Sequence, residues 1–286
     1  MRRKTMVVVA ALAAAFAAAT SAEAPAPPAP PASVPDITTT NPAILCVDCD
    51  HQFDIPIHNK ILNGLVSNPY IGELRKALYT QDTYHQFQSK AHFDNCDFEG
   101  ATTYISELFD ETGRYVEVAT KAKAAGNTPA LKKAVLSAFF SLGQALHATQ
   151  DFYAHTNYVE LQAPKVKKVT DIELVFPWRA EGRARIKELQ GVGMISGFVF
   201  WGVPQKCPSG SISHANLAKD SANTKSGKAI VTSLNLSQYR IAVYLAREAS
   251  LELLTDAFKR WPLLKEVNGE SVAIEVLVDR RGLDKP

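Results

Sequence analysis

Three residues of one segment have the types and the spacing of a metal site. His147, Asp151 and His155 recur every four residues within the stretch from Gly143 to Glu160. In an α-helix of 3.6 residues per turn, side chains at this spacing lie on one face. Imidazole and carboxylate groups bind zinc in proteins, and a carboxylate can bridge two ions. The pattern therefore predicts a metal site. The alternative is a buried helix whose polar residues bond to their neighbours.

Further histidines and aspartates could complete such a site. The chain has seven histidines: His51, His58, His85, His92, His147, His155 and His214. Asp82 precedes His92 by ten residues, and Asp220 follows His214 by six. Each pair alone is more simply explained as surface or core residues. Together with the helical triplet they favour zinc, which suits imidazole and carboxylate ligands and needs no redox partner.

The amino-terminal residues predict export. Residues 1–24 combine a basic start, an apolar run and the small-residue site Ala22-Glu23-Ala24, which is typical of a cleaved signal peptide. A membrane anchor is the alternative, but the apolar run is short. Cleavage near Ala24 leaves 28 basic and 28 acidic residues. A balanced charge does not predict a binding surface for nucleic acid or for acidic membranes. We therefore expect a secreted or periplasmic protein.

Four cysteines remain after export, namely Cys46, Cys49, Cys96 and Cys207. In an oxidising compartment an even number most simply forms two disulfides, for which three pairings are possible. Half of a zinc site at Cys46-x-x-Cys49 is the alternative, but a second pair at that spacing is missing. Disulfides are therefore favoured.

The apolar spacing predicts an all-α domain. Residues 25–44 are rich in proline and alanine and predict an extended tether. Apolar periodicity predicts helices over Pro56–Val66, Thr102–Ala125, Leu131–Tyr158 and Leu234–Trp261. We expect one compact multi-helix domain over 45–262.

Two segments do not fit this pattern. Residues 162–213 mix a basic patch, a charged helical piece near Glu181–Glu188 and the apolar run Phe198–Trp201, and we expect an insertion or lid. Residues 263–286 form a C-terminal extension, in which Ser271–Val278 predicts a short strand.

The order of these residues resembles the zinc-dependent phospholipase C and single-strand nuclease superfamily, and most of all the bacterial relatives of Het-C proteins. The similarity runs from about Ile55 to Tyr158 and resumes from Ser196 through Asp220, about two-thirds of the mature chain. The residues that match the ligand pattern in order are His58, Asp82, His92, His147, Asp151, His155 and His214. The resemblance implies a helical, zinc phospholipase C-like domain with two or three zinc ions in a cleft.

The resemblance also implies individual roles. Asp151 would bridge two metals, and Asp82 would be a ligand that also orients or deprotonates the attacking water. His155, His214 and Asp220 would hold another zinc. In the family the mature amino terminus is itself a ligand, whereas here it lies far from His58. We expect His51 in that role, with Asp50 as the alternative.

Two departures bear on the third metal and on the substrate. One helical turn past His214 the chain has Ala218 where the phospholipases have a carboxylate, so Asp220 can replace it only outside a regular helix. Thr83 follows Asp82 where the phospholipases place an aromatic residue that binds the head group. The head group therefore stays open.

The sequence thus predicts a phospholipase C-type hydrolase with a phospholipid substrate and transient contact with a membrane surface. The neutral mature chain and the apolar run at Phe198–Trp201 favour lipid over nucleic acid. The alternative for this run is a buried strand or the lining of a lid. The alternatives are a secreted single-strand nuclease and a zinc-stabilised interaction protein without catalysis. The sequence does not indicate an oligomeric state.

Overall fold

The structure, a computed structural model, describes residues 55–62, 65–66 and 68–268. This part of the chain is mostly helical, and its one sheet is a two-stranded antiparallel hairpin, which confirms the expected all-α class. In chain order the elements are α1 (Ile55–Ile61), α2 (Asn68–Tyr84), α3 (Ser89–His92), α4 (Phe98–Ala124), α5 (Thr128–His155), α6 (Tyr158–Gln162), η1 (Ala163–Lys165), η2 (Val169–Asp171), α7 (Ala180–Gly191), α8 (His214–Leu217), β1 (Ile230–Val231), β2 (Leu236–Ser237), α9 (Gln238–Arg260) and α10 (Pro262–Asn268).

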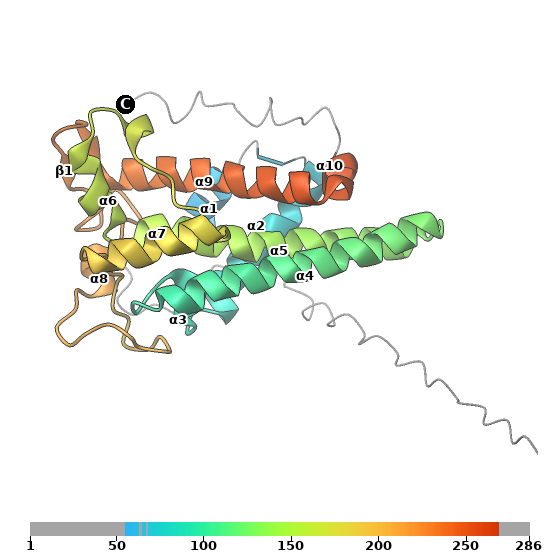
Figure 1. Cartoon of the computed structure of the whole chain (residues 1–286), viewed down its shortest axis with the longest axis horizontal. Helices are drawn as coiled ribbons and strands as arrows, with labels where there is room; N and C mark the ends of the chain where they lie inside the picture. The colour runs from blue at the N-terminus through green and yellow to red at the C-terminus, as the bar shows by residue number, and fades with distance from the viewer. Residues whose placement is uncertain (1–54, 63–64, 67, 269–286) are drawn as a thin grey trace, which may run out of the picture.

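Helix α5 is the centre of the fold. It contacts α2, α4 and α9, and it runs antiparallel to α4 along the length of the molecule (Figure 1). The apolar residues that predicted this helix, such as Phe139, Leu142 and Leu146, are fully buried. Every residue from Ser141 to His155 is buried as well. The polar residues in this half of α5 must therefore find partners inside the protein.

The helix boundaries follow from local hydrogen bonds. Helix α5 begins at Thr128, because the Asn127 side chain caps it by accepting from the backbone N–H of Ala130 at 3.1 Å. It ends at His155 rather than at the expected Tyr158, because Thr156 is extended and forms an isolated bridge with Ser196. Helix α2 was not expected from the sequence, although it carries Asp82.

The region expected to be an insertion or lid divides into two parts. In its first half Val175, Ile186 and Leu189 are buried in the core, and Val175 exchanges two 3.0 Å hydrogen bonds with the Tyr153 hydroxyl of α5. This half is a covering layer of the domain and not a separate lid. The second half, after Met194, forms the loops around α8.

The helical domain also extends past the boundary expected at residue 262. Helix α10 reaches Asn268 and buries Leu264 completely. No helix of the described ranges is both long and apolar enough to cross a membrane. Several predictions concern residues outside the described ranges, and these stay predictions. They are the signal peptide, the tether, the role of His51 or Asp50, and the strand at Ser271–Val278.

One disulfide is present in the described part. Cys96 and Cys207 are joined, with their Cα atoms 4.9 Å apart. The bond links the segment after α3 to the loop before α8 and agrees with the expectation of disulfides. Cys46 and Cys49 lie outside the described residues.

Gly143 allows α2 and α5 to pack closely. A Cβ atom at this position would lie 2.6 Å from the Ala77 Cβ and 2.9 Å from the Leu74 carbonyl oxygen, both in α2. These distances are shorter than contacts between real Cβ atoms and their neighbours. The absence of a side chain here therefore sets the separation of the two helices, and with it the position of Asp82 at the end of α2.

Gly143→Ala should push α2 away from α5. We expect a loss of about 1–3 kcal/mol in the free energy of unfolding, measured by urea denaturation, because the added methyl group overpacks a rigid contact. Gly72→Ala is the control, because Gly72 is an exposed α2 position with open space around it. It should stabilise the protein by up to about 1 kcal/mol through helix propensity. Equal effects of the two changes would contradict this account of the packing.

Candidate metal centre

The last turns of α5 present His147, Asp151 and His155 on one face, as their spacing predicted. The Nδ1 atom of His147 lies 3.1 Å from Asp151 Oδ2, and the Nδ1 atom of His155 lies 3.9 Å from the same oxygen. Asp151 is completely buried. Its carboxylate therefore needs compensating partners, and residues from other helices supply them.

His58 of α1 approaches the second oxygen of Asp151, with its Nε2 atom 3.3 Å from Oδ1. Its Nδ1 atom lies 2.5 Å from the Gln150 amide oxygen. The Gln150 orientation is set from α9, because its amide N–H donates to Ser250 Oγ, and that hydroxyl donates to the Ala246 carbonyl. Nδ1 of His58 must therefore be the donor. In the neutral ring Nε2 then carries the lone pair that a metal requires.

His92 reaches Asp151 from α3, with its Nδ1 atom 3.0 Å from Oδ2. The chain reverses directly after His92, where Phe93, Asn95 and Cys96 all have positive φ angles between 53° and 57°. The Asn95 side chain holds this turn by donating to Ser89 Oγ and accepting from the Val199 N–H, at 2.8 and 2.7 Å. These bonds and the disulfide fix His92 at the centre.

Asp82 lies in the last turn of α2 and contacts His147 on the ring edge away from Asp151. Its Oδ1 atom is 2.9 Å from His147 Nε2. The side chain is 11% exposed, so it borders the solvent-accessible edge of the cluster. Its Oδ2 atom is buried and has no hydrogen-bond partner among the described residues, as is also true of His92 Nε2. Both atoms have lone pairs available for a cation.

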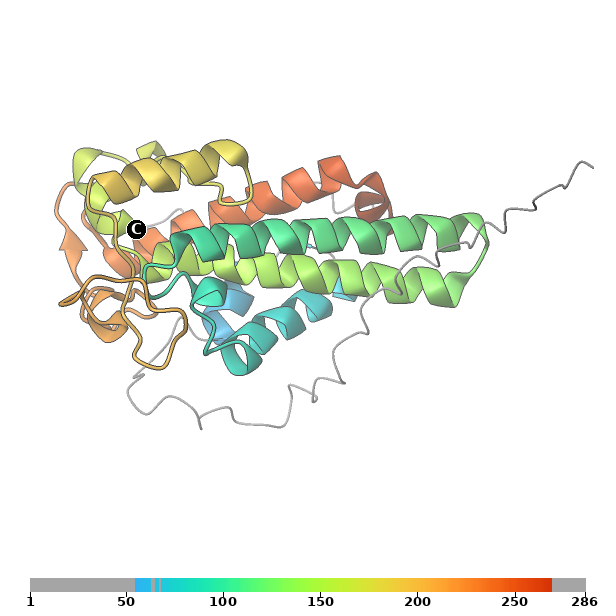
Figure 2. The same ribbon diagram turned by 60° about the horizontal axis from the view of Figure 1, so that its bottom comes forward.

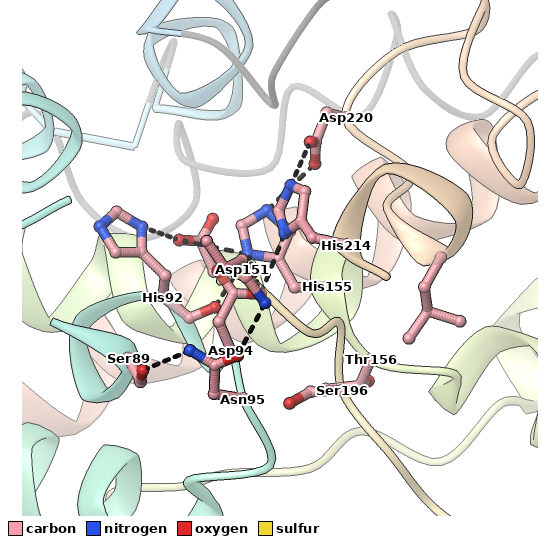
Figure 3. Close-up of polar contacts among 12 residues, drawn as sticks. Ser89, His92, Asp94, Asn95, Asp151, His155, Thr156, Ser196, His214 and Asp220 are labelled. Carbon is pink, nitrogen blue, oxygen red and sulfur yellow. Dashed lines mark hydrogen bonds and ion pairs between the residues drawn. The ribbon is translucent and has the colours of Figure 1, made fainter. Parts of the chain in front are cut away.

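A second group of residues adjoins the first at the end of α5. His155 and His214 lie between two carboxylates, Asp94 and Asp220 (Figure 3). On one side Asp94 Oδ1 is 3.0 Å from His214 Nδ1 and 3.7 Å from His155 Nδ1. On the other side the Asp220 oxygens are 3.1 Å from His155 Nε2 and 3.3 Å from His214 Nε2.

Asp220 reaches this position because the segment is not a regular helix, which is the condition that the sequence required. Helix α8 ends at Leu217, and Ala218 is extended, with φ −63° and ψ 142°. His214 is brought close by Gly197, at which a Cβ atom would lie 2.6 Å from the His214 Cα. Asp220 therefore places a carboxylate beside His155 and His214, although position 218 is an alanine.

Hydrogen bonds decide which nitrogen of His155 can bind a metal. Its Nδ1 atom is 2.8 Å from the His92 carbonyl oxygen, which can only accept, so Nδ1 donates. The lone pair of the neutral ring is then on Nε2, toward Asp220. His214 has a carboxylate at each ring nitrogen, Asp94 at Nδ1 and Asp220 at Nε2. With Asp220 as the ligand, Asp94 would orient His214 through Nδ1, in the manner of a carboxylate behind a metal-bound histidine.

Asp94 is the residue that the sequence reasoning missed. It was visible in His92-Phe93-Asp94-Asn95, but nothing in that tetrapeptide shows that the chain turns back toward His214, 120 residues later. By distance alone Asp94, His155 and His214 form a possible metal-binding group. The donor role of His155 Nδ1 favours Asp220 over Asp94 as the direct ligand.

The described residues contain two further groups whose ligand atoms lie within 4.8 Å of one another. One is His58, His147 and Asp151, and the other is Asp82, His92 and His147. Two ligand atoms that share a tetrahedral zinc ion at about 2.0–2.1 Å lie about 3.3 Å apart. The 3.3 Å between His58 Nε2 and Asp151 Oδ1 matches that spacing. The cluster could therefore bind metal ions.

The structure thus brings together eight of the nine predicted ligands, and the ninth, His51, lies outside the described residues. The eight are His58, Asp82, His92, His147, Asp151, His155, His214 and Asp220. Their function as ligands stays a prediction. Six of the eight are buried, with Asp82 and His214 partly exposed.

The neighbouring carboxylates favour protonation of His147 and His155. Burial alone would lower the pKa of His147, but Asp151 and Asp82 raise it to about 10. Burial would also lower the pKa of His155, but Asp151, Asp220 and Asp94 raise it to about 9. In return, His147 and His155 hold the pKa of Asp151 well below its usual value against the effect of burial. A metal ion must therefore displace protons from this cluster.

No protein-family profile, no curated protein and no solved structure matches this chain. The chemistry of the centre is therefore argued from its own geometry.

Zinc content should separate the roles of Asp94 and Asp220. We expect two or three zinc ions per wild-type chain by elemental mass spectrometry, and one fewer in Asp220→Asn, because a direct ligand is lost. Asp94→Asn should keep the number of ions but bind one of them about 10–100-fold more weakly in a chelator competition, because a metal-bound histidine loses its orienting partner. The reverse result would assign Asp94 as the ligand.

The metal-free protein should lose stability as the pH rises. The folded-state pKa values of His147 and His155, about 10 and about 9, exceed the ordinary value of 6.5. Their contribution to stability is then complete below pH 6.5 and is lost as the pH rises through 9 and 10. We expect the melting temperature of chelator-treated protein to fall between pH 6.5 and 9.5. Zinc-loaded protein should fall less, and an equal decline would contradict the assignment.

Proposed function

We propose that this chain is an exported zinc-dependent phosphodiesterase of the phospholipase C type. The observation that carries the proposal is the cluster centred on Asp151, in which adjoining His/Asp groups share His147. Two buried atoms of the cluster, Asp82 Oδ2 and His92 Nε2, have no hydrogen-bond partner among the described residues. The Cys96–Cys207 disulfide is compatible with a secreted or periplasmic location. The resemblance of the ligand order to the zinc phospholipase C and nuclease superfamily supports the same reaction class.

The residues present fit zinc. His58 offers Nε2 and Asp151 offers Oδ1 at the spacing of two zinc ligands, while Asp82 Oδ2 and His92 Nε2 have no competing hydrogen bond among the described residues. Zinc bound here would supply a hydroxide at neutral pH and would neutralise charge on the phosphoryl oxygens. Asp151 would hold two ions at once, because its two oxygens face different histidines.

Asp82 has the geometry of a group that handles the proton of the attacking water. One oxygen accepts from His147 Nε2, which fixes the carboxylate, and the other has no partner among the described residues. As the partly exposed aspartate at the edge of the cluster, it is accessible to a substrate. A carboxylate held in this way can accept a proton as the water attacks phosphorus.

A purely structural zinc site is less consistent with these residues. Structural sites are closed, four-coordinate and rich in cysteine, whereas catalytic sites use histidine and carboxylate and keep a position open. The two cysteines among the described residues, Cys96 and Cys207, are bonded to each other. Among phosphodiesters, a phospholipid is favoured over nucleic acid, because the mature chain has no excess of basic residues.

The test is hydrolysis by zinc-loaded protein of phosphatidylcholine and of a single-stranded oligonucleotide in parallel. We expect release of a phosphorylated head group and intact DNA. Asp82→Asn should lower the rate by about 100-fold or more, the typical contribution of a general base. Its circular dichroism spectrum should be unchanged. Asp171→Asn is the matched control, because Asp171 is an exposed aspartate at the end of η2.

Each other outcome has a definite meaning. Cleavage of the oligonucleotide that declines steeply with salt would make the protein a nuclease. Full activity in Asp82→Asn would remove the role assigned to that carboxylate. If the zinc-loaded wild type cleaves neither substrate, the phosphodiesterase proposal is wrong.

A further inference from the structure

Four large apolar side chains are exposed on two neighbouring turns beside the metal centre. Tyr84 and Phe87, in and after the last turn of α2, are 63% and 53% exposed. Phe200 and Val203, in the loop before α8, are 70% and 63% exposed. We call these four residues the apolar rim. Exposed large apolar side chains that gather in one place mark binding surfaces, whereas scattered ones need no explanation.

The two turns are held together by backbone hydrogen bonds. The Val203 N–H donates to the Phe87 carbonyl at 2.9 Å, and the Val203 carbonyl accepts from the Ser89 N–H at 3.0 Å. The Cys96–Cys207 disulfide and the Asn95 bond to Val199 tie the same loop to the turn after α3. The loop lies beside the end of α2 in Figure 2. The backbone that carries the rim is therefore held in one arrangement.

The rim is continuous with the candidate metal centre. Ser89, whose N–H bonds to the Val203 carbonyl, is the first residue of α3, and the last residue of that helix is the predicted ligand His92. At the other end of the loop the His214 N–H donates to the Phe198 carbonyl at 2.9 Å, so the loop leads directly to a second predicted ligand. A molecule that covers the rim would therefore lie beside the group of Asp82, His92 and His147, at whose edge Asp82 is partly exposed.

The rim carries almost no formal charge. From Ile195 to Ser213 the one Lys, Arg, Asp or Glu is Lys206, and it pairs with Asp97 at 2.7 Å. From Thr83 to Ser89 there is none. A surface that binds nucleic acid needs a cluster of free lysine or arginine side chains. An uncharged surface with Tyr and Phe at its centre suits a zwitterionic lipid interface, where aromatic rings contact both head groups and acyl chains.

We propose that the apolar rim docks the protein onto the surface of a zwitterionic phospholipid bilayer, so that lipid enters the metal centre at the Asp82 edge. The proposal rests on the proposed phospholipase function and specifies its substrate as lipid in an aggregate. Docking by apolar side chains releases ordered water and does not depend on counterions. Binding should therefore persist at high salt.

The test is co-sedimentation of the zinc-loaded protein with phosphatidylcholine vesicles after brief incubation on ice. We expect the wild type to bind, with no loss in high salt. The double variant Phe87→Ser/Phe200→Ser should bind at least about tenfold more weakly, because it removes two large apolar side chains that would enter the bilayer. Ile230→Ser is the matched control, because Ile230 is 61% exposed but lies on β1, away from this loop (Figure 1). Zinc content and circular dichroism confirm that each variant is folded.

Three outcomes would overturn the docking surface: no binding by the wild type, equal binding by the double variant, or loss of wild-type binding in high salt. The proposed function is tested separately with the wild type on a short-chain phosphatidylcholine kept below its critical micelle concentration. If the wild type hydrolyses neither monomers nor vesicles, while vesicle binding still depends on Phe87 and Phe200, the phospholipase proposal alone is wrong. Hydrolysis of both forms without rim-dependent binding would overturn the docking surface alone.

Discussion

The buried carboxylate of Asp151 is the group around which the rest of the structure is arranged. It lies inside the central helix, and a carboxylate without partners in such a place would be very costly. Imidazole nitrogens from α1, α3 and α5 surround it at 3.0–3.3 Å. These nitrogens compensate the buried negative charge, and a bound cation would compensate it further. Metal binding at the cluster would therefore stabilise the fold.

The elements that complete the cluster are too short to be stable alone. Helices α3 and α8 have four residues each, and isolated helices of that length do not form in water. Their positions come from tertiary contacts: the disulfide, the Asn95 hydrogen bonds and the close approach at Gly197. A cation at the centre would add a further link among α1, α2, α3 and α5. Binding of such a cation would therefore be coupled to folding of this end of the molecule.

The loop that carries Asp220 has its own internal support. Lys219 is fully buried and donates to Glu160 at 3.0 Å, and Ser226 donates to the same Glu160 oxygen at 2.7 Å. Burial lowers the pKa of Lys219, while Glu160 acts in the opposite direction. This pair anchors the loop to α6 on the side of the backbone away from the cluster. The neighbouring Asp220 is thereby held toward His155 and His214.

The helical class and the triplet on the central helix could be predicted from the sequence, because both depend on local periodicity. The order of the other candidate ligands came instead from the resemblance to the zinc phospholipase C and nuclease superfamily. Spacing of four residues along a helix fixes which side chains share a face, so His147, Asp151 and His155 could be placed together before any fold was known. The same periodicity identified the central helix through its buried residues Phe139, Leu142 and Leu146. It misplaced helix ends by a few residues, because caps such as Asn127 and bridges such as Thr156–Ser196 decide them.

Long-range packing decided what local patterns do not encode. Asp94 meets His214 across 120 residues, and Phe87 and Ser89 meet Val203 because backbone hydrogen bonds join two distant turns. The choice between Asp94 and Asp220 as a ligand depends on a single hydrogen bond, which the Nδ1 atom of His155 donates to the His92 carbonyl oxygen. Such contacts form only when distant segments of the chain pack together. Residue types and spacing determined which groups are available for chemistry, and tertiary packing determined which of their atoms face one another.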